Sequence, residues 1–251
     1  MGNIPQDVDD IFRRLEKEVW WLQIHWKTYH QLFNHSKSRF QMLHECCDAA
    51  FSCIRNALET EILMSLCRLT DDDKDVLSLK KLHGQIGKNG QEELGRKLRG
   101  TWKCILKKRQ QIEEHRNNRL AHLNREIALN ERPGPGPIMA KELEGAITAL
   151  QEYLSTIRSH FTQAPAFASD VLTVGDGETL VSLIRDGLRL RELIREGKVC
   201  PKDVRGGKWA DVWEEGSRKA SAGDFLILPG PSSARENPAR NKAQEVGPSP
   251  E

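Results

Sequence analysis

The sequence contains no run of about 18 or more apolar residues, so we expect no transmembrane helix. Its N-terminus lacks the charged and apolar regions of a secretory signal peptide. The six cysteines form no C-x-x-C pair, and reduced thiols in the cytosol are the simplest account of them. The sequence therefore predicts a cytoplasmic protein.

The motifs of several common enzyme classes are also missing. The chain has no G-x-S-x-G, H-E-x-x-H or Walker motif, which argues against hydrolases, zinc proteases and NTPases of those classes. His44 precedes Cys47 by three residues, but no second close pair of ligands exists to complete a zinc site. We expect Cys46 and Cys47 to pack as small apolar residues, and we expect no metal and no cofactor.

Aromatic residues are scarce, with two Tyr and seven Phe, whereas 29% of the residues are charged. This balance suits helices with solvated outer faces better than a β-sandwich. Trp20, Trp21 and Trp26 lie on one amphipathic segment, where such residues are more often core and interface anchors than base-stacking platforms. The length fits one large domain, or one domain of ordinary size with extensions.

Apolar residues recur at helical spacing through most of the chain. Ser36 or Ser38 and Ser78 stand where helices are expected to begin, as N-cap residues. The alternating Pro and Gly of residues 132–137 predict a loop. We expect helices at 7–33, from about 36 to 69, at 79–86, from 91 to about 124, at 139–161 and at 178–196.

These elements predict an all-α fold, an antiparallel bundle of four to five long helices with a short insert helix, followed by a C-terminal helix and a flexible tail. Residues 1–165 would form the bundle and residues 166–198 the appended helix. Residues 199–251 are rich in Gly, Pro, Ser and charge, so we expect a mostly disordered tail.

The positive charge is concentrated in one stretch. Residues 96–125 contain ten Lys or Arg and two Glu, a net charge of +8 against +2 for the whole chain. Such a block favours phosphate, although a solvated helix face explains it equally well on this evidence alone.

The same stretch carries the residues best suited to chemistry. Arg116 lies four residues after Ile112 on the apolar track of the helix, where a guanidinium is costly unless it is paired or reaches water. His115, Arg119 and His122 form a neighbouring stripe. Arg116 and His122 are six residues apart, about 120° around a straight helix. A bend, the reach of Arg or a second copy of the chain is needed to unite them, which favours a composite site in a dimer.

The segment Arg116-Asn117-x4-His122 resembles the R-[polar]-x4-H signature of the HEPN superfamily. The wider layout is similar to the abortive-infection, AbiU-like branch over roughly residues 7–165. The other landmarks are His25-Trp26-Lys27-Thr28-Tyr29, Cys67-Arg68-Leu69-Thr70-Asp71 and Ser78-Leu79-Lys80-Lys81-Leu82.

This resemblance implies a metal-independent endoribonuclease of toxin or phage-defence type that cleaves RNA through its own 2′-hydroxyl. His122 would be the acid/base and Arg116 would bind the phosphate, supported by Asn117 and Arg119. Lys107, Lys108 and Arg109 are the expected RNA contacts.

The expected partners are RNA, a second copy of the chain, and an antitoxin or second defence component. Some relatives carry a Tyr two residues after the His, where adenylate is added to silence the toxin. Residue 124 is Asn, so that control is not supported. Two alternatives stay open, a non-catalytic module that binds RNA, a nucleotide or a protein, and a purely structural adaptor.

Overall fold

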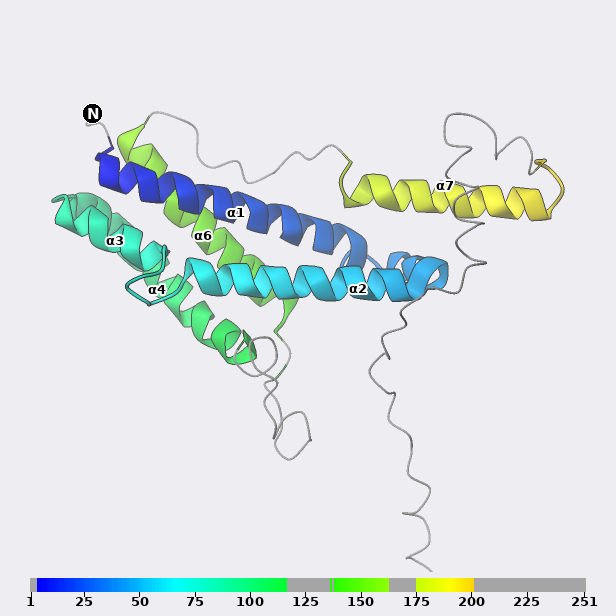
Figure 1. Cartoon of the computed structure of the whole chain (residues 1–251), viewed down its shortest axis with the longest axis horizontal. Helices are drawn as coiled ribbons and strands as arrows, with labels where there is room; N and C mark the ends of the chain where they lie inside the picture. Colours follow the sequence, from blue (N-terminus) through cyan, green and yellow to red (C-terminus); the bar gives the residue numbers. More distant parts are fainter. Residues whose placement is uncertain (1–3, 117–135, 137, 163–174, 201–251) are drawn as a thin grey trace, which may run out of the picture. The chain divides into compact units, whose positions relative to one another are not determined.

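The computed structural model describes residues 4–116, 136, 138–162 and 175–200 (Figure 1). Every regular element among them is a helix, which confirms the all-α prediction. None of the helices in these ranges is long and apolar enough to cross a membrane. The helices are α1 (Gln6–Phe33), α2 (Lys37–Leu69), α3 (Leu79–Lys88), α4 (Glu92–His115), α6 (Ala140–Phe161) and α7 (Gly177–Arg195).

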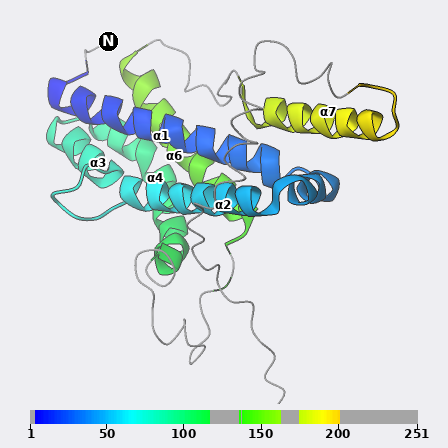
Figure 2. The ribbon, with the colours of Figure 1, turned by 45° about the vertical axis from the view of Figure 1, so that its right-hand side comes forward.

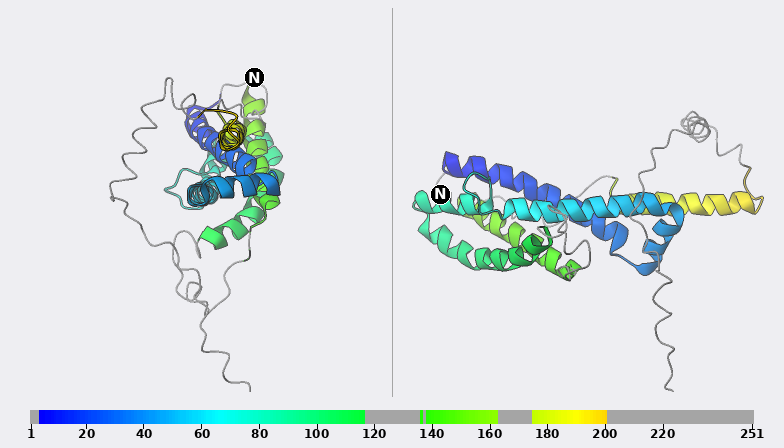
Figure 3. Two further views of the ribbon diagram at one scale, coloured as in Figure 1. Left: turned by 90° about the vertical axis from the view of Figure 1, so that its right-hand side faces the viewer. Right: turned by 60° about the horizontal axis from the view of Figure 1, so that its bottom comes forward.

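The helices pack as antiparallel neighbours. Figure 2 shows α1 and α2 running in opposite directions, and the right-hand view of Figure 3 shows α4 beside α6. Apolar side chains from five helices meet in one core, because each helix presents a stripe of them to its neighbours. Its central members include Leu15 and Leu22 of α1, Ile62 and Leu66 of α2, Leu82 of α3, Leu98 and Ile105 of α4, and Leu150 and Ile157 of α6.

The long second helix departs from the prediction of one continuous apolar stripe. Its backbone leaves helical geometry at Cys47, where φ is −154° and ψ is 68°. Cys47 is exposed rather than packed as expected, and so are Phe40 and Ile54. The first half of α2 instead buries Leu43 in a small separate cluster with α1. The spacing of apolar residues alone does not show where along α2 the packing against other helices ends.

Ser36 and Ser78 both precede helices as predicted, but their hydroxyls make different contacts. The Ser36 hydroxyl accepts a hydrogen bond from the Arg39 N–H of α2 at 3.2 Å, as an N-cap should. Ser78 precedes α3 as expected, but its hydroxyl is buried without a hydrogen-bond partner in the described part of the chain. The prediction of a Ser78 side-chain cap is therefore wrong.

The tryptophans of α1 divide between the surface and the core. Trp20 and Trp21 are 40% and 45% exposed, so neither belongs to the core. Their rings meet edge to face at 5.0 Å. Only Trp26 is half-buried and packs against the main core.

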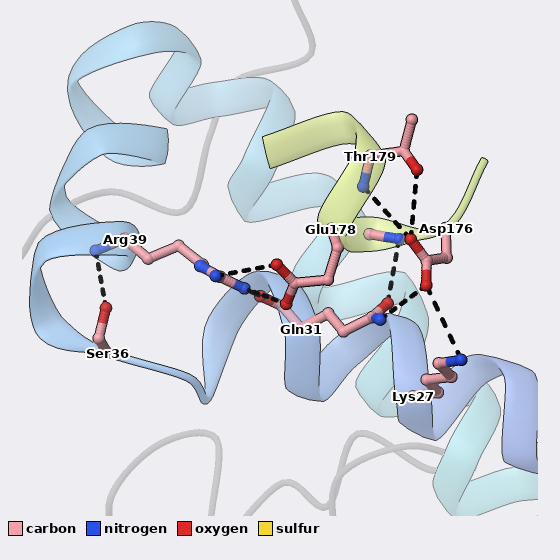
Figure 4. A network of polar contacts seen from close by, with 8 residues as sticks. Lys27, Gln31, Ser36, Arg39, Asp176, Glu178 and Thr179 are labelled. Atoms are coloured by element: carbon pink, nitrogen blue, oxygen red, sulfur yellow. Dashed lines mark hydrogen bonds and ion pairs between the residues drawn. The ribbon is translucent and has the colours of Figure 1, made fainter. Parts of the chain in front are cut away.

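By their tertiary contacts, the described residues up to Glu192 form one compact unit, and those from Leu193 onward belong to a separate one. Within the first unit, polar contacts fasten the start of α7 to the turn between α1 and α2 (Figure 4). Arg39 donates two hydrogen bonds to Glu178, at 2.6 and 3.0 Å, and these lower the pKa of the Glu178 carboxyl. Gln31 donates to Asp176 at 2.8 Å and accepts from the Gly177 N–H at 3.0 Å.

Backbone contact at Gly177 leaves no room for a side chain. A Cβ at this residue would lie 2.9 Å from the Cβ of Gln31, whereas a Cβ at Gly187 in the same helix would meet nothing within 4 Å. Substitutions at the two glycines can therefore be compared, one in close contact and one in open space.

We predict that Gly177→Ala loosens α7 from the α1–α2 turn, because the methyl group displaces Gln31. Gly187→Ala should instead stabilise α7 by about 0.5–1 kcal/mol, since Ala loses less backbone entropy in a helix. Amide hydrogen exchange across α7 measures both. Equal protection of α7 in the two variants would contradict the close contact at Gly177.

A partly buried polar pair joins α3 to α6. The Nδ1 of His83 and the hydroxyl of Tyr153 are 2.8 Å apart, and Trp102 of α4 stacks on the imidazole at 5.6 Å. Burial lowers the pKa of His83, and the nearby charge of Arg99 adds to this effect. The folded chain therefore holds His83 neutral at a pH where the unfolded chain would protonate it.

We predict that the free energy of unfolding decreases as pH falls below about 6.5, the ordinary pKa of His, because the unfolded state then binds a proton that the folded state resists. The loss is complete once the pH lies below the folded pKa. His83→Asn should flatten this dependence, whereas His35→Asn, at an exposed position, should not. Urea titrations at several pH values measure the effect, and parallel curves for all three proteins would contradict it.

Candidate active site

The described part of the predicted catalytic segment ends at Arg116, directly after α4. Arg116 keeps helical geometry, with φ −54° and ψ −53°, and its N–H donates to the carbonyls of Ile112 and Glu113. Ile112 is buried in the core one turn earlier. Arg116 therefore continues the apolar track of α4, as its spacing predicts.

Arg116 lies near the last turn of α2. Its Nε is buried and has no hydrogen-bond partner among the described residues. Its positive charge acts on the thiol of Cys67, in the last turn of α2. Burial raises the pKa of Cys67 to about 11, and the positive charge of Arg116 opposes that rise.

The surroundings of Arg116 differ from those of the other half-buried arginines. Within the residues that the structure describes, the other four each form an ion pair with a carboxylate, and Arg116 forms none. The four pairs are Arg39 with Glu178, Arg55 with Glu59, Arg109 with Asp72 and Glu113, and Arg158 with Glu16. A half-buried guanidinium without an acid is suited to an anionic ligand.

The remaining residues of the predicted catalytic motif, Asn117, Arg119 and His122, lie outside the described residues. The structure therefore positions Arg116 and leaves the roles of the other three as predictions.

The three expected RNA contacts of α4 point in different directions. Lys107 is exposed. The Nζ of Lys108 lies 2.7 Å from where a Cβ of Gly145 in α6 would be, so this side chain packs across α6. Arg109 is held between Asp72 and Glu113, and it lowers the pKa of the Asp72 carboxyl by hydrogen bonding. These contacts give Arg109 a structural role, and its binding to RNA stays a prediction.

A second group of cations lies beside Asp72. A cavity of about 300 Å³ is lined by Asp72, Asp73, Gly84, Gln85 and four lysines, and Lys80 is 3.6 Å from Asp72. The lysines are Lys74, Lys80, Lys81 and Lys88. The basic block at residues 96–125 did not include them, because α3 is separate in sequence. Arg109 and Asp72 connect this group to α4.

The sequence places His115 on a stripe with Arg119 and His122, but in the structure its side chain makes a contact with the backbone. Its side chain is 9% exposed, and its Nε2 is hydrogen-bonded to the carbonyl of Gly136. This contact ties the end of α4 to the chain just before α6. His115 therefore has a structural role at the candidate site, because it binds the backbone carbonyl of Gly136.

A cavity of about 540 Å³ opens beside His115. Its walls come from α1, α2 and the start of α6. The residues that line it are Trp26, Tyr29, Arg55, Asn56, Glu59, Thr60, Ile62, Leu63, His115, Ile138, Ala140 and Leu143. Its volume lies in the range of about 300–1,000 Å³ that is typical of small-molecule sites.

Three polar side chains form a chain of contacts on one wall of this cavity. The Tyr29 hydroxyl donates to Glu59 Oε1 at 2.8 Å, and Arg55 Nε donates to the same oxygen at 2.8 Å. Burial, followed by the hydrogen bond to Glu59, raises the pKa of Tyr29, so its hydroxyl keeps its proton. Sequence reasoning missed this group. Tyr29 belongs to one of the landmarks of the resemblance, but the i, i+4 pair of Arg55 and Glu59 resembles an ordinary exposed helix pair.

In the described ranges, no three His, Cys, Asp or Glu side chains lie close enough together to hold a metal ion.

Comparison with known proteins gives one match. The family model named HEPN_AbiU2 and described as AbiU2 matches residues 5–180. No curated protein and no solved structure matches the chain. The match covers more than half of the chain and includes α1 to α6 and the first residues of α7. The protein therefore belongs to the AbiU2 family of HEPN proteins, whose domains are associated with abortive infection.

Proposed function

We propose that this protein is a metal-independent endoribonuclease of toxin or phage-defence type. Family membership supports the class, since HEPN domains are often ribonucleases. The observation that carries the proposal is Arg116, a half-buried guanidinium with no acidic partner among the described residues.

Arg116 is suited to hold the scissile phosphate. A guanidinium stays charged at all working pH values and offers a planar fork of donors that fits phosphate oxygens. Burial of Nε strengthens its interaction with negative charge, because less water screens it. In the transition state, the phosphorus oxygens gain negative charge, so a cation fixed at this place lowers the barrier.

His122 supplies the proton transfers in this proposal. The 2′-hydroxyl of the RNA loses its proton to a base, and its oxygen attacks the adjacent phosphorus. The bond from phosphorus to the 5′-oxygen breaks, and that oxygen takes up a proton from an acid. The products are a 2′,3′-cyclic phosphate and a free 5′-hydroxyl. Imidazole titrates closest to neutral pH and serves as either group.

Two copies of the chain complete the site. Six residues separate Arg116 from His122, a rotation of about 120° on a straight helix, so one helix does not present both side chains to one phosphate. A homodimer with its two motifs facing one cleft supplies both groups from opposite sides. RNA and a second copy are therefore the proposed partners, with an antitoxin or second defence component as regulator.

We predict that His122→Ala reduces RNA cleavage by about 10²–10⁴-fold, the usual contribution of a general acid or base. Arg116→Ala should reduce it by about 10²–10³-fold, since it removes a cation from the developing charge. The matched control is Arg96→Ala, an exposed arginine earlier on α4, which should keep nearly full activity. End-labelled RNA, incubated with EDTA, measures cleavage and the cyclic phosphate.

Thermal unfolding of all variants checks that each is folded. Cleavage that stops with EDTA, or equal loss in the Arg96 and Arg116 variants, would contradict the mechanism. RNA binding that depends on Arg116 without any turnover by the dimer would show instead that the protein is a binding module.

A further inference from the structure

We propose that the cavity beside His115 binds a guanine base of the RNA, next to the phosphate held by Arg116. This inference rests on the proposed function and adds a specificity site to it. The residues that carry it are Trp26 and Tyr29 of α1 and Arg55 and Glu59 of α2, all of which line the cavity.

One wall of the cavity is aromatic. The rings of Trp26 and Tyr29 are nearly parallel, at 20°, with centroids 5.9 Å apart. Both are half-buried, and Leu63, Ile138 and Leu143 extend the apolar surface. Flat apolar surfaces of this kind stack well with the face of a nucleobase, and RNA-binding proteins read unpaired bases in this way.

The polar wall has unused hydrogen-bonding capacity. Glu59 Oε1 accepts from both Tyr29 and Arg55, whereas Oε2 takes part in no hydrogen bond among the described residues. Asn56 and Thr60 lie on the neighbouring turns of α2 and also line the cavity. A ligand that presents N–H donors would complete the coordination of Glu59.

The charge of the cavity favours a base over a phosphate. Among its described lining residues, the only side chains that are ionised at all working pH values are Arg55 and Glu59, which neutralise each other across 2.8 Å. A second phosphate would meet the Glu59 carboxylate, whereas a neutral base would not. Arg116, which lacks such an acid among the described residues, provides the place for the phosphate.

The two features are close enough to contact one nucleotide and its phosphate. Leu63 lines the cavity, and Cys67, which responds to the charge of Arg116, follows it by one turn of α2. One turn corresponds to about 5.4 Å along the helix axis. His115 lines the cavity and directly precedes Arg116 in the chain.

The donor pattern selects guanine among the four bases. Guanine presents N1–H and the N2 amino group side by side, and both donate to the open oxygen of Glu59, Oε2, while its O6 next to them accepts from Arg55 or Asn56. Uracil offers one N–H between two carbonyl oxygens, one of which would face the carboxylate. Adenine and cytosine each offer a single amino group beside ring acceptors, and a carboxylate repels those acceptors.

The test uses short 2′-O-methyl RNA, which lacks the free 2′-hydroxyl and is not cleaved. One fluorescent oligomer contains a single guanine among uridines, and the other contains uridines alone. Anisotropy with the full chain should show tighter binding of the first. Glu59→Gln should remove at least about tenfold of that preference, the order expected from a well-matched contact to a base edge. The amide still accepts from Tyr29, so the wall of the cavity is kept.

Glu45→Gln is the matched control, because it makes the same change at an exposed position earlier on α2. It should leave the guanine preference unchanged. Asn56→Trp, which fills the cavity from an exposed position, should abolish the preference without altering the core. Equal binding of the two oligomers, or a preference that survives both Glu59→Gln and Asn56→Trp, would overturn the proposal.

The two proposals fail separately. If the Glu59 variant changes neither binding nor the cut positions while Arg116→Ala abolishes cleavage, the guanine site is wrong and the ribonuclease stands. If guanine binding depends on Glu59 but no RNA is ever cleaved, the base site stands and the ribonuclease is wrong.

Discussion

The packing of α4 against its neighbours is the constraint on which the site depends. Leu94, Leu98, Ile105 and Ile112 are buried along one face of this helix, and that burial fixes its rotation and position. Arg116 lies one turn beyond Ile112, and its charge acts on Cys67 of α2. The apolar core thereby holds a guanidinium in a place that its own hydration would not favour. A protein without a use for that charge would be expected to place an acid beside it, as this chain does for Arg109 on the same helix.

The candidate site has a charged region and a neutral region. Arg116 carries an uncompensated charge among the described residues, whereas Arg55 and Glu59 compensate each other on the wall of the cavity. RNA has the same division, with charge on its phosphates and neutral bases between them. His115 stands between the two regions, and its hydrogen bond to Gly136 keeps the end of α4 and the start of α6 together.

The contacts of α7 show how a peripheral helix is positioned by a few polar groups. The bidentate pair of Arg39 and Glu178 and the two hydrogen bonds of Gln31 hold its first turn, and the close approach at Gly177 permits them. Val181 and Ile184 then pack against the small cluster around Leu32 and Leu43. The match to the family model ends at residue 180, within these contacts.

The sequence by itself determined the helices and the rotation of α4, because these follow from local spacing, whereas the candidate role of Arg116 came from the resemblance of its motif to the HEPN signature. Only the tertiary structure decided that Arg116 lacks an acidic partner where the chain is described while Arg109 has two. It also brought Tyr29 to Glu59 across 30 residues and formed the cavity. Spacing could not reveal the break at Cys47, the unsatisfied hydroxyl of Ser78 or the exposure of Trp20 and Trp21. Each of these depends on which neighbour a helix meets, and that is settled by packing between segments distant in sequence.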